Sequence, residues 1–308
     1  MTASSPATRI GLGLDAGGTQ TRWALATPDG QLVAQGQAAP ISGAQLGSDD
    51  GRAAFARTLA ELAADASRHG AASGVLAGIT GLGTEHTPTL NALLARAFAL
   101  PLSAVGSMSD IGLACHAAFA PGQGYVVYAG TGSIAAYLDD AGALHRAGGR
   151  GPVIDDAGGG HWIARQALRQ VWRVEDVEPG AWQRSALARA LFDTLGGSDW
   201  AATRQWVYGA TRGEIGMLAL AVARAAHEGD VAALALLQEA GVELARLGRA
   251  LLRRHGARPL ALAGRVFDLH PAIETALRDS LPAGTVSRRL ILHAHHTAAR
   301  LAAARGRP

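Results

Sequence analysis

Residues 10–25 read Ile-Gly-Leu-Gly-Leu-Asp-Ala-Gly-Gly-Thr-Gln-Thr-Arg-Trp-Ala-Leu, an apolar run that ends at Asp15, two glycines, and a second, alternating run. This pattern predicts two antiparallel strands joined by a tight glycine hairpin. Gly17 and Gly18 allow positive φ and close backbone approach, so that the hairpin amides can converge on an anion. The carboxylate of Asp15 can reach a phosphate only through a cation such as Mg²⁺. We therefore predict a metal–nucleotide phosphate site, the alternative being a Gly-Gly pair that serves turn geometry alone.

The same order of elements returns near residue 124. A strand over 125–129, a Gly130–Ser133 turn, a strand over 134–138 and a further strand over 143–146 repeat the pattern of residues 9–37. We interpret this as an internal duplication, in which two hairpins would hold one polyphosphate from two sides; the alternative is a chance likeness of two ordinary hairpins. The candidate phosphate-binding residues of both hairpins are Gly17, Gly18, Thr19, Thr21, Gly130, Thr131, Gly132 and Ser133.

The composition narrows the chemistry. A chain of 308 residues, 48% hydrophobic and 17% charged, is globular and long enough for two domains. Its net charge of +3 comes from arginines scattered among acids, without the basic stripe that nucleic-acid binding requires. The chain contains no lysine, which excludes a Walker-type phosphate loop and a pyridoxal phosphate Schiff base.

The single cysteine, Cys115, excludes an intramolecular disulfide and a cysteine-built zinc or iron–sulfur site within one chain. Its small apolar neighbours favour a buried helix residue over a nucleophile. No apolar run reaches the roughly 18 residues of a membrane helix, and the N-terminus has no signal-peptide pattern. We therefore expect a cytoplasmic protein without a membrane partner.

Alternating strand and helix patterns predict an α/β fold with mixed sheets flanked by helices. The expected strands are 9–15, 21–27, 31–37, 74–80, a short one up to Val105, and 259–263 in addition to those of the second hairpin. The expected helices are 50–69, 86–99, 160–173, 180–195, 200–210, 213–228, 230–255, 271–280 and 293–305.

Two further segments could carry chemistry. Asp110 lies between a predicted strand and a predicted helix, where a carboxylate is either an N-cap or a base that takes a proton from an attacking hydroxyl. The segment 148–160 holds six glycines and two aspartates ahead of a predicted helix. Such a loop suits close contact with a small polar ligand such as a sugar, whose hydroxyls donate to carboxylates; a flexible linker is the alternative.

Taken together, these motifs resemble a known family. The first hairpin resembles that of the superfamily of sugar kinases, actin and heat-shock ATPases, and the 148–160 loop resembles the signature loop of the N-acetylglucosamine kinase group in the BadF/BadG/BcrA/BcrD ATPase family. The resemblance implies a duplicated, two-domain ribonuclease H-like (actin-like ATPase) fold, each domain opening with a β-meander. It places one domain at 1–115 with a C-terminal helix at 293–308, and the other, with helical insertions, at 116–292.

The resemblance also implies an activity, an ATP- and Mg²⁺-dependent transfer of phosphate to the 6-hydroxyl of N-acetylglucosamine or glucosamine, and a homodimer. Asp15 would hold Mg²⁺ through water, and Asp110 would be the base at that hydroxyl. The residues implied for the amino sugar are Gly149, Asp156, Gly160 and, where the family commonly has asparagine, the Ser42 region. Those implied for adenosine are Gly264 and Val266.

The chain departs from the family pattern at Asp155 and Ala157 in the signature loop, which leaves the sugar open. Other functions stay possible at this point. An ATP-driven activator of an acyl-CoA dehydratase or reductase is one alternative, because such proteins resemble the chain in their phosphate motifs. It is disfavoured, because these activators hold an iron–sulfur cluster between subunits with two cysteines from each, and this chain has one cysteine. A sugar-sensing regulator would need an N-terminal DNA-binding domain, for which no room is expected. A sugar-binding protein that has lost catalysis is the remaining alternative.

The triplet His293, His295 and His296 is a further feature of the C-terminal segment. Its spacing gives neither the i, i+4 histidine pair of a helical metal site nor a nearby carboxylate. We therefore expect a surface helix end and no metal site there.

Overall fold

The computed structural model describes residues 9–304, which form two compact units. Unit one comprises the chain up to Ala117 together with the segment from Leu292 onward, and unit two is Ala118–Ile291. The domain boundaries proposed from the sequence are 115/116 and 292/293. Residues 1–8 and 305–308, which the first proposed domain includes, lie outside the described residues.

Unit one is built on a five-stranded sheet with the order β3-β2-β1-β4-β5. The first three strands form an antiparallel meander, whereas β4 and β5 run parallel to β1. The strands are β1 (Gly11–Ala16), β2 (Thr21–Ala26), β3 (Leu32–Ala38), β4 (Gly74–Ile79) and β5 (Val105–Ser109), and the helices are α1 (Asp49–Ser67), α2 (Thr87–Ala97), α3 (Asp110–Ala118) and α11 (Ala294–Ala304).

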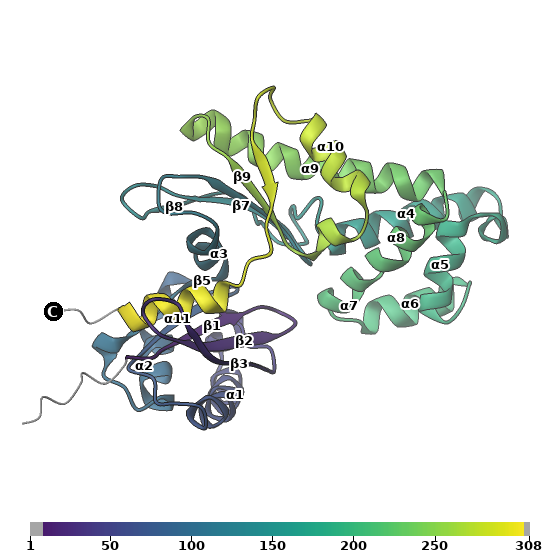
Figure 1. Cartoon of the computed structure of the whole chain (residues 1–308). Helices are drawn as coiled ribbons and strands as arrows, with labels where there is room; N and C mark the ends of the chain where they lie inside the picture. The colour runs from purple at the N-terminus through teal and green to yellow at the C-terminus, as the bar shows by residue number, and fades with distance from the viewer. Residues whose placement is uncertain (1–8, 305–308) are drawn as a thin grey trace, which may run out of the picture. The chain divides into compact units, whose positions relative to one another are not determined.

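The two faces of β1 differ in side-chain size, because alternate residues of a strand point to opposite faces. Leu12 and Leu14 are fully buried in a core that also contains residues of α1 and α2. Gly11 and Gly13 face α11, the yellow helix that lies along the first strands in Figure 1. A Cβ on Gly13 would lie 2.1 Å from the carbonyl oxygen of His295, so only glycine lets the helix approach this closely.

Unit two repeats this design with the order β10-β9-β6-β7-β8. Its strands are β6 (Tyr125–Ala129), β7 (Ser133–Leu138), β8 (Leu144–Gly148), β9 (Leu260–Ala263) and β10 (Ser287–Arg289). β6, β7 and β8 form the antiparallel meander, and β9 and β10 are parallel to β6. Each strand thus has a counterpart in unit one, which confirms the predicted duplicated α/β fold with two mixed sheets.

The rest of unit two is largely helical (Figure 1). Its helices are α4 (Gly160–Val177), α5 (Ala186–Leu195), α6 (Trp200–Gly209), α7 (Arg212–Met217), α8 (Ala219–His227), α9 (Val231–His255) and α10 (Pro271–Asp279). The core joins the sheet to the buried faces of α4, α5, α8 and α9. No helix within residues 9–304 is both long and apolar enough to span a bilayer.

Some of the predicted elements are wrong in detail, and one strand was not predicted. The strand predicted to end at Val105 begins there and continues to Ser109, because polar residues follow the valine where the strand is only partly covered. The helix predicted over 213–228 is two helices, α7 and α8, separated at Leu218. The short strand β10 was not predicted, since its sequence Ser-Arg-Arg has no apolar alternation.

Candidate functional site

The first glycine hairpin joins β1 to β2 and leaves backbone donors free. The amide of Gly17 donates to the carbonyl of Gln20 at 3.0 Å and closes the turn. Within the part of the chain that the structure describes, the amides of Gly18 and Thr19 make no backbone hydrogen bond, and both residues are exposed. Exposed, adjacent and unpaired amides form an anion-binding concavity. This geometry supports the predicted phosphate role, which stays a proposal.

Two carboxylates of unit one lie at the same edge of its sheet. Asp15 is near the end of β1, and Asp110 follows the parallel strand β5 and begins α3. Burial, followed by the negative charge of Asp110, raises the pKa of Asp15 to about 6 against the opposing positive charge of Arg22. Burial also raises the pKa of Asp110, against hydrogen bonds from the Ile111 amide and the Thr80 side chain. A cation would relieve the crowding of these charges, so the pair fits a divalent metal ion.

We expect Asp15 to make the ligand-free protein less stable as the pH rises. Its folded pKa of about 6 lies above the unfolded value of 3.8, so its favourable contribution is complete below that value and is lost as the pH rises through 6. The loss is about 3 kcal/mol of unfolding free energy. Urea unfolding between pH 4 and 7 should show a steeper decline in the wild type than in Asp15→Asn, which keeps the contribution of the other buried carboxylates such as Asp110. An Asp50→Asn control, at an exposed position, should decline as the wild type does; a decline of equal size in the wild type and Asp15→Asn would contradict the assignment.

The surroundings of Asp110 connect it to the predicted sugar segment. The backbone carbonyl of Thr80 accepts from the amide of Gly43 at 2.9 Å, and the Thr80 side chain hydrogen-bonds to Asp110. Ser42, the neighbour of Gly43, is half-buried, and its backbone amide donates to Oε1 of Gln45 at 2.8 Å. Thr80 therefore joins the Ser42 segment to the carboxylate, although nothing in the sequence pattern singles Thr80 out.

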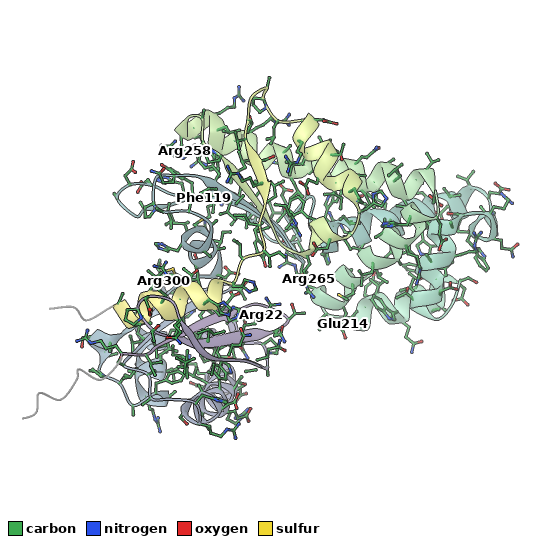
Figure 2. The ribbon with its side chains drawn as sticks, viewed as in Figure 1. Arg22, Phe119, Glu214, Arg258, Arg265 and Arg300 are labelled. Carbon is green, nitrogen blue, oxygen red and sulfur yellow. The ribbon has the colours of Figure 1, made fainter. Side chains whose placement is uncertain are left out.

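Thr21, the last hydroxyl of the first hairpin, is fully buried, and its Oγ1 accepts from the Ile41 amide at 3.3 Å. The neighbouring Arg22, labelled in Figure 2, is exposed on β2 and pairs in register with Asp15. The hydrogen bond to Thr21 therefore holds the start of the Ser42 segment in place. Arg22, which lies opposite Asp15 in the strand pairing, supplies a positive charge that acts on this carboxylate.

The second glycine hairpin, between β6 and β7, has the same design. The amide of Gly130 donates to the carbonyl of Gly132 at 2.9 Å and closes the turn. Among residues 9–304 no backbone acceptor engages the amides of Thr131 and Gly132. The hydroxyl of Ser133, however, is buried and donates to the carbonyl of Ala157 at 2.6 Å, so it braces the 148–160 loop.

The 148–160 loop packs directly on this hairpin. The amide of Gly160, at the start of α4, donates to the carbonyl of Gly130 at 2.8 Å, and the Gly149 amide donates to the carbonyl of Ser133 at 3.1 Å. A Cβ on Gly159 would lie 2.7 Å from the Cα of Gly132. Glycine is thus required where two backbones meet, which explains the run of glycines better than a flexible linker would.

Asp156 is the buried charge of this loop, with 5% of its surface exposed. Its Oδ1 accepts from the Gly151 amide at 3.1 Å, and its Oδ2 is paired with Nη2 of Arg212 at the start of α7. Burial raises the pKa of Asp156, and the Arg212 charge opposes that shift. Both carboxylate oxygens already have partners, so Asp156 can meet a sugar only through its remaining lone pairs. Its neighbour Asp155 is paired with Arg246 at 2.8 Å.

We expect Asp156 and Arg212 to be energetically coupled. Removing Arg212 leaves the buried Asp156 carboxylate without its ion-pair partner, whereas removing both side chains avoids that penalty. Urea unfolding of Asp156→Asn, Arg212→Met and the double variant should give a coupling free energy of about 1–2 kcal/mol, reduced from the fully buried case because Arg212 is partly exposed. Strict additivity of the two single effects would show that the pair contributes nothing.

The predicted adenosine segment adjoins the second hairpin through its glycine. Gly264 has φ +99°, and a Cβ there would lie 2.2 Å from the carbonyl oxygen of Ala129, the last residue of β6. Val266 is buried within a short 3-10 helix, Arg265–Asp268. Only glycine fits the junction between β9 and the hairpin.

The predicted residues therefore fall into two groups, one in each unit. Unit one carries Asp15, Gly17, Gly18, Thr19, Thr21, Ser42 and Asp110, and unit two carries Gly130, Thr131, Gly132, Ser133, Gly149, Asp156, Gly160, Gly264 and Val266. Within unit two, the hairpin contacts both the 148–160 loop and Gly264. Sequence reasoning missed Arg22, which lies opposite Asp15 in the strand pairing, and it missed Thr80 and Arg212, whose partners are distant along the chain.

Two sheets with one strand order, each opening with a glycine hairpin, define the fold of the actin-like ATPases and the ROK sugar kinases. The chain belongs to the BadF/BadG/BcrA/BcrD ATPase family, whose model matches residues 12–299. Membership of this family implies the use of ATP. None of the curated proteins matches the chain.

Solved structures share the fold. A candidate N-acetylglucosamine kinase from Chromobacterium violaceum is 27% identical, with a TM-score of 0.72 over 96% of this chain and 100% of its own. A candidate N-acetylglucosamine kinase from Porphyromonas gingivalis is 15% identical, with a TM-score of 0.64 over 93% and 96%. A ROK family glucokinase from Streptomyces griseus, solved with glucose and AMPPNP, is 17% identical, with a TM-score of 0.58 over 96% and 98%.

Proposed function

We propose that the protein is a sugar kinase that transfers the γ-phosphate of ATP to an amino sugar. The observation that carries this proposal is the pair of half-buried carboxylates, Asp15 and Asp110, at one edge of the first sheet beside the free amides of Gly18 and Thr19. Phosphoryl transfer needs this combination, because the protein must neutralise charge, hold phosphate oxygens and orient a hydroxyl with one carboxylate.

In this proposal the two carboxylates have different roles. Asp15 holds Mg²⁺, which when bound neutralises phosphate charge. Asp110 accepts a hydrogen bond from the sugar hydroxyl and takes its proton as the new bond to phosphorus forms. The raised pKa of Asp110 makes it a better proton acceptor than an ordinary aspartate, and Thr80 and the Ile111 amide fix its orientation.

The phosphate contacts come from backbone amides and hydroxyls, because the chain has no lysine. The free amides of Thr131 and Gly132 are the unit-two counterparts of those at Gly18 and Thr19. Thr19 and Thr131 add hydroxyl donors. Ser133 and Thr21, whose hydroxyls already have protein partners, hold their loops in place instead.

The finer part of the proposal is the substrate, N-acetylglucosamine or glucosamine, phosphorylated at the 6-hydroxyl. It rests on the family membership and on the 148–160 loop, where Gly149, Asp156 and Gly160 would meet the sugar. The 27% identity to the candidate N-acetylglucosamine kinase from Chromobacterium violaceum supports this choice.

An ADP-release assay with glucosamine, N-acetylglucosamine, glucose and N-acetylmannosamine tests the proposal. We expect turnover in the presence of ATP and Mg²⁺, with an amino sugar giving the highest kcat/KM. After reduction of the product to its open-chain alditol, resistance to periodate cleavage between positions 5 and 6 would support phosphorylation of the 6-hydroxyl, and cleavage there would contradict it. Absence of turnover with all four sugars, together with measurable sugar binding, would favour a sugar sensor. The proposed homodimer is measured separately by light scattering.

A further inference from the structure

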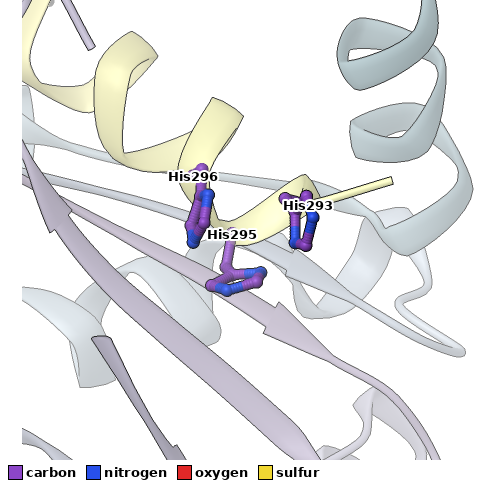
Figure 3. A group of neighbouring side chains, drawn as sticks. All are labelled: His293, His295 and His296. Atoms are coloured by element: carbon purple, nitrogen blue, oxygen red, sulfur yellow. The ribbon is translucent and has the colours of Figure 1, made fainter. Parts of the chain in front are cut away.

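Three imidazole rings gather where α11 begins (Figure 3). His293 directly precedes the helix, and His295 and His296 lie in its first turn. One potential ligand atom from each ring lies within 4.8 Å of the other two. The rings of His295 and His296 have centroids 4.2 Å apart, and that of His293 stacks on His296 at 5.0 Å. The expectation of a surface helix end is therefore wrong for His295, which is buried.

His295 has a buried nitrogen without a partner. The residue is 5% exposed, and among residues 9–304 no group hydrogen-bonds its Nδ1. A buried polar atom without a hydrogen-bond partner is unfavourable, so this nitrogen calls for a ligand that the protein itself does not supply. Burial, followed by the nearby His296 and Arg22, lowers the pKa of His295 to about 4. The ring is therefore neutral near pH 7, which is the form that binds metal.

His296 has the arrangement of a metal ligand with a supporting partner. Nε2 of His296 lies 2.7 Å from Oε1 of Gln35 on β3, so a hydrogen bond between α11 and β3 orients the ring. The other ring nitrogen, Nδ1, is the one that could bind a metal ion. Ligating histidines almost always use their second nitrogen in this way, which fixes the tautomer and the ring direction. Gln35 and His296 are 261 positions apart in the chain, so only the fold creates this support.

We propose that His293, His295 and His296 form a binding site for a borderline divalent transition-metal ion of the Zn²⁺ class. Three neutral imidazole nitrogens suit such ions, whereas Mg²⁺ and Ca²⁺ prefer oxygen ligands. With zinc–nitrogen distances of about 2.0–2.1 Å, tetrahedral ligand atoms lie about 3.4 Å apart, so ligand atoms that are up to 4.8 Å apart need to approach by up to about 1.4 Å. Exposed His293 leaves the fourth position to water.

The proposed zinc site differs from the proposed magnesium site in its ligands, which are imidazole nitrogens rather than the Asp15 carboxylate, and its test does not depend on the proposed activity. The Arg22 charge lies near His295 and acts against a bound cation, and no carboxylate belongs to the three-histidine group found among the described residues. We therefore expect micromolar affinity.

The test uses untagged full-length protein stripped with EDTA, titrated with ZnCl₂ by calorimetry and with Co²⁺ by visible absorption. We expect one ion per chain, a Co²⁺ spectrum of tetrahedral type, and a higher Tm with Zn²⁺. His293→Ala, at an exposed position, should weaken binding at least tenfold without changing the metal-free Tm. His69→Ala, equally exposed on unit one, should bind as the wild type does.

Gln35→Ala provides a second variant that leaves all three rings in place. We expect a severalfold weaker affinity, since the ring of His296 loses its support. The proposal is overturned if the wild type binds no Zn²⁺, or if His293→Ala and His69→Ala bind with the same affinity. Calorimetry and Tm measurements need no turnover. The outcome of the metal-binding test is therefore distinguishable from the outcome of the kinase assay.

Discussion

Asp110→Asn protein is expected to bind ATP within about threefold of the wild-type affinity and to transfer its γ-phosphate at least about a hundredfold more slowly. The asparagine side chain keeps the size of the carboxylate and can still bond to Thr80, but it cannot take the proton of an attacking hydroxyl. The raised pKa of Asp110, caused by burial, indicates a carboxylate that accepts a proton readily. Isothermal titration with ATP and steady-state ADP release measure the two quantities separately.

The matched control is Asp49→Asn. Asp49 also lies in the first turn of a helix, α1, but it is exposed and pairs with Arg52 on the surface. This variant should turn over normally. If Asp110→Asn also turned over normally, Asp110 would be a capping carboxylate only; if it lost both turnover and folding, circular dichroism would reveal the loss.

Gly13→Ala is expected to lower the free energy of unfolding of unit one by about 3 kcal/mol or more, or to prevent soluble expression. The added Cβ would lie 2.1 Å from the carbonyl oxygen of His295 and 2.2 Å from the amide nitrogen of Ala299. Both are backbone atoms of α11, so no side chain can rotate away. The helix must move off β1 and expose the small residues that pack beneath it.

Gly47→Ala is the control, because a Cβ at Gly47 would meet nothing within 4 Å. It should change stability by less than about 0.5 kcal/mol. Urea unfolding followed by tryptophan fluorescence measures both variants, since Trp23 lies on β2 within unit one and is fully buried. Equal stability of the two variants would show that α11 tolerates displacement from β1.

The predictable part of the molecule is local. The sixteen consecutive residues 10–25 predict two strands and a turn, because an apolar run ends at Asp15 and a glycine pair and an alternating run follow it. The structure has β1 and β2 there. The second meander was predictable for the same reason. The strand β10 and the break at Leu218 were not, because they depend on what packs beside them rather than on their own pattern.

The partners of the candidate site residues could not be predicted. Arg212 reaches Asp156 across 56 positions, and the Thr80 side chain reaches Asp110 across a strand and a helix. The histidine triplet is a sharper example. Its spacing along the chain argues against a metal site, yet the helix start turns the three rings toward one another and the sheet supplies Gln35. Convergence of this kind is a property of tertiary packing.

The position of α11 has a consequence for how the chain matures during synthesis. Unit two is one continuous segment of the chain, whereas unit one is completed only by a segment that follows unit two. The glycine face of β1 receives its cover only when Ala294–Ala304 emerge from the ribosome. The strand that carries Asp15 is thus synthesised before all of unit two and covered only after it, and a nascent chain that stalls before residue 294 exposes this strand to chaperones and proteases.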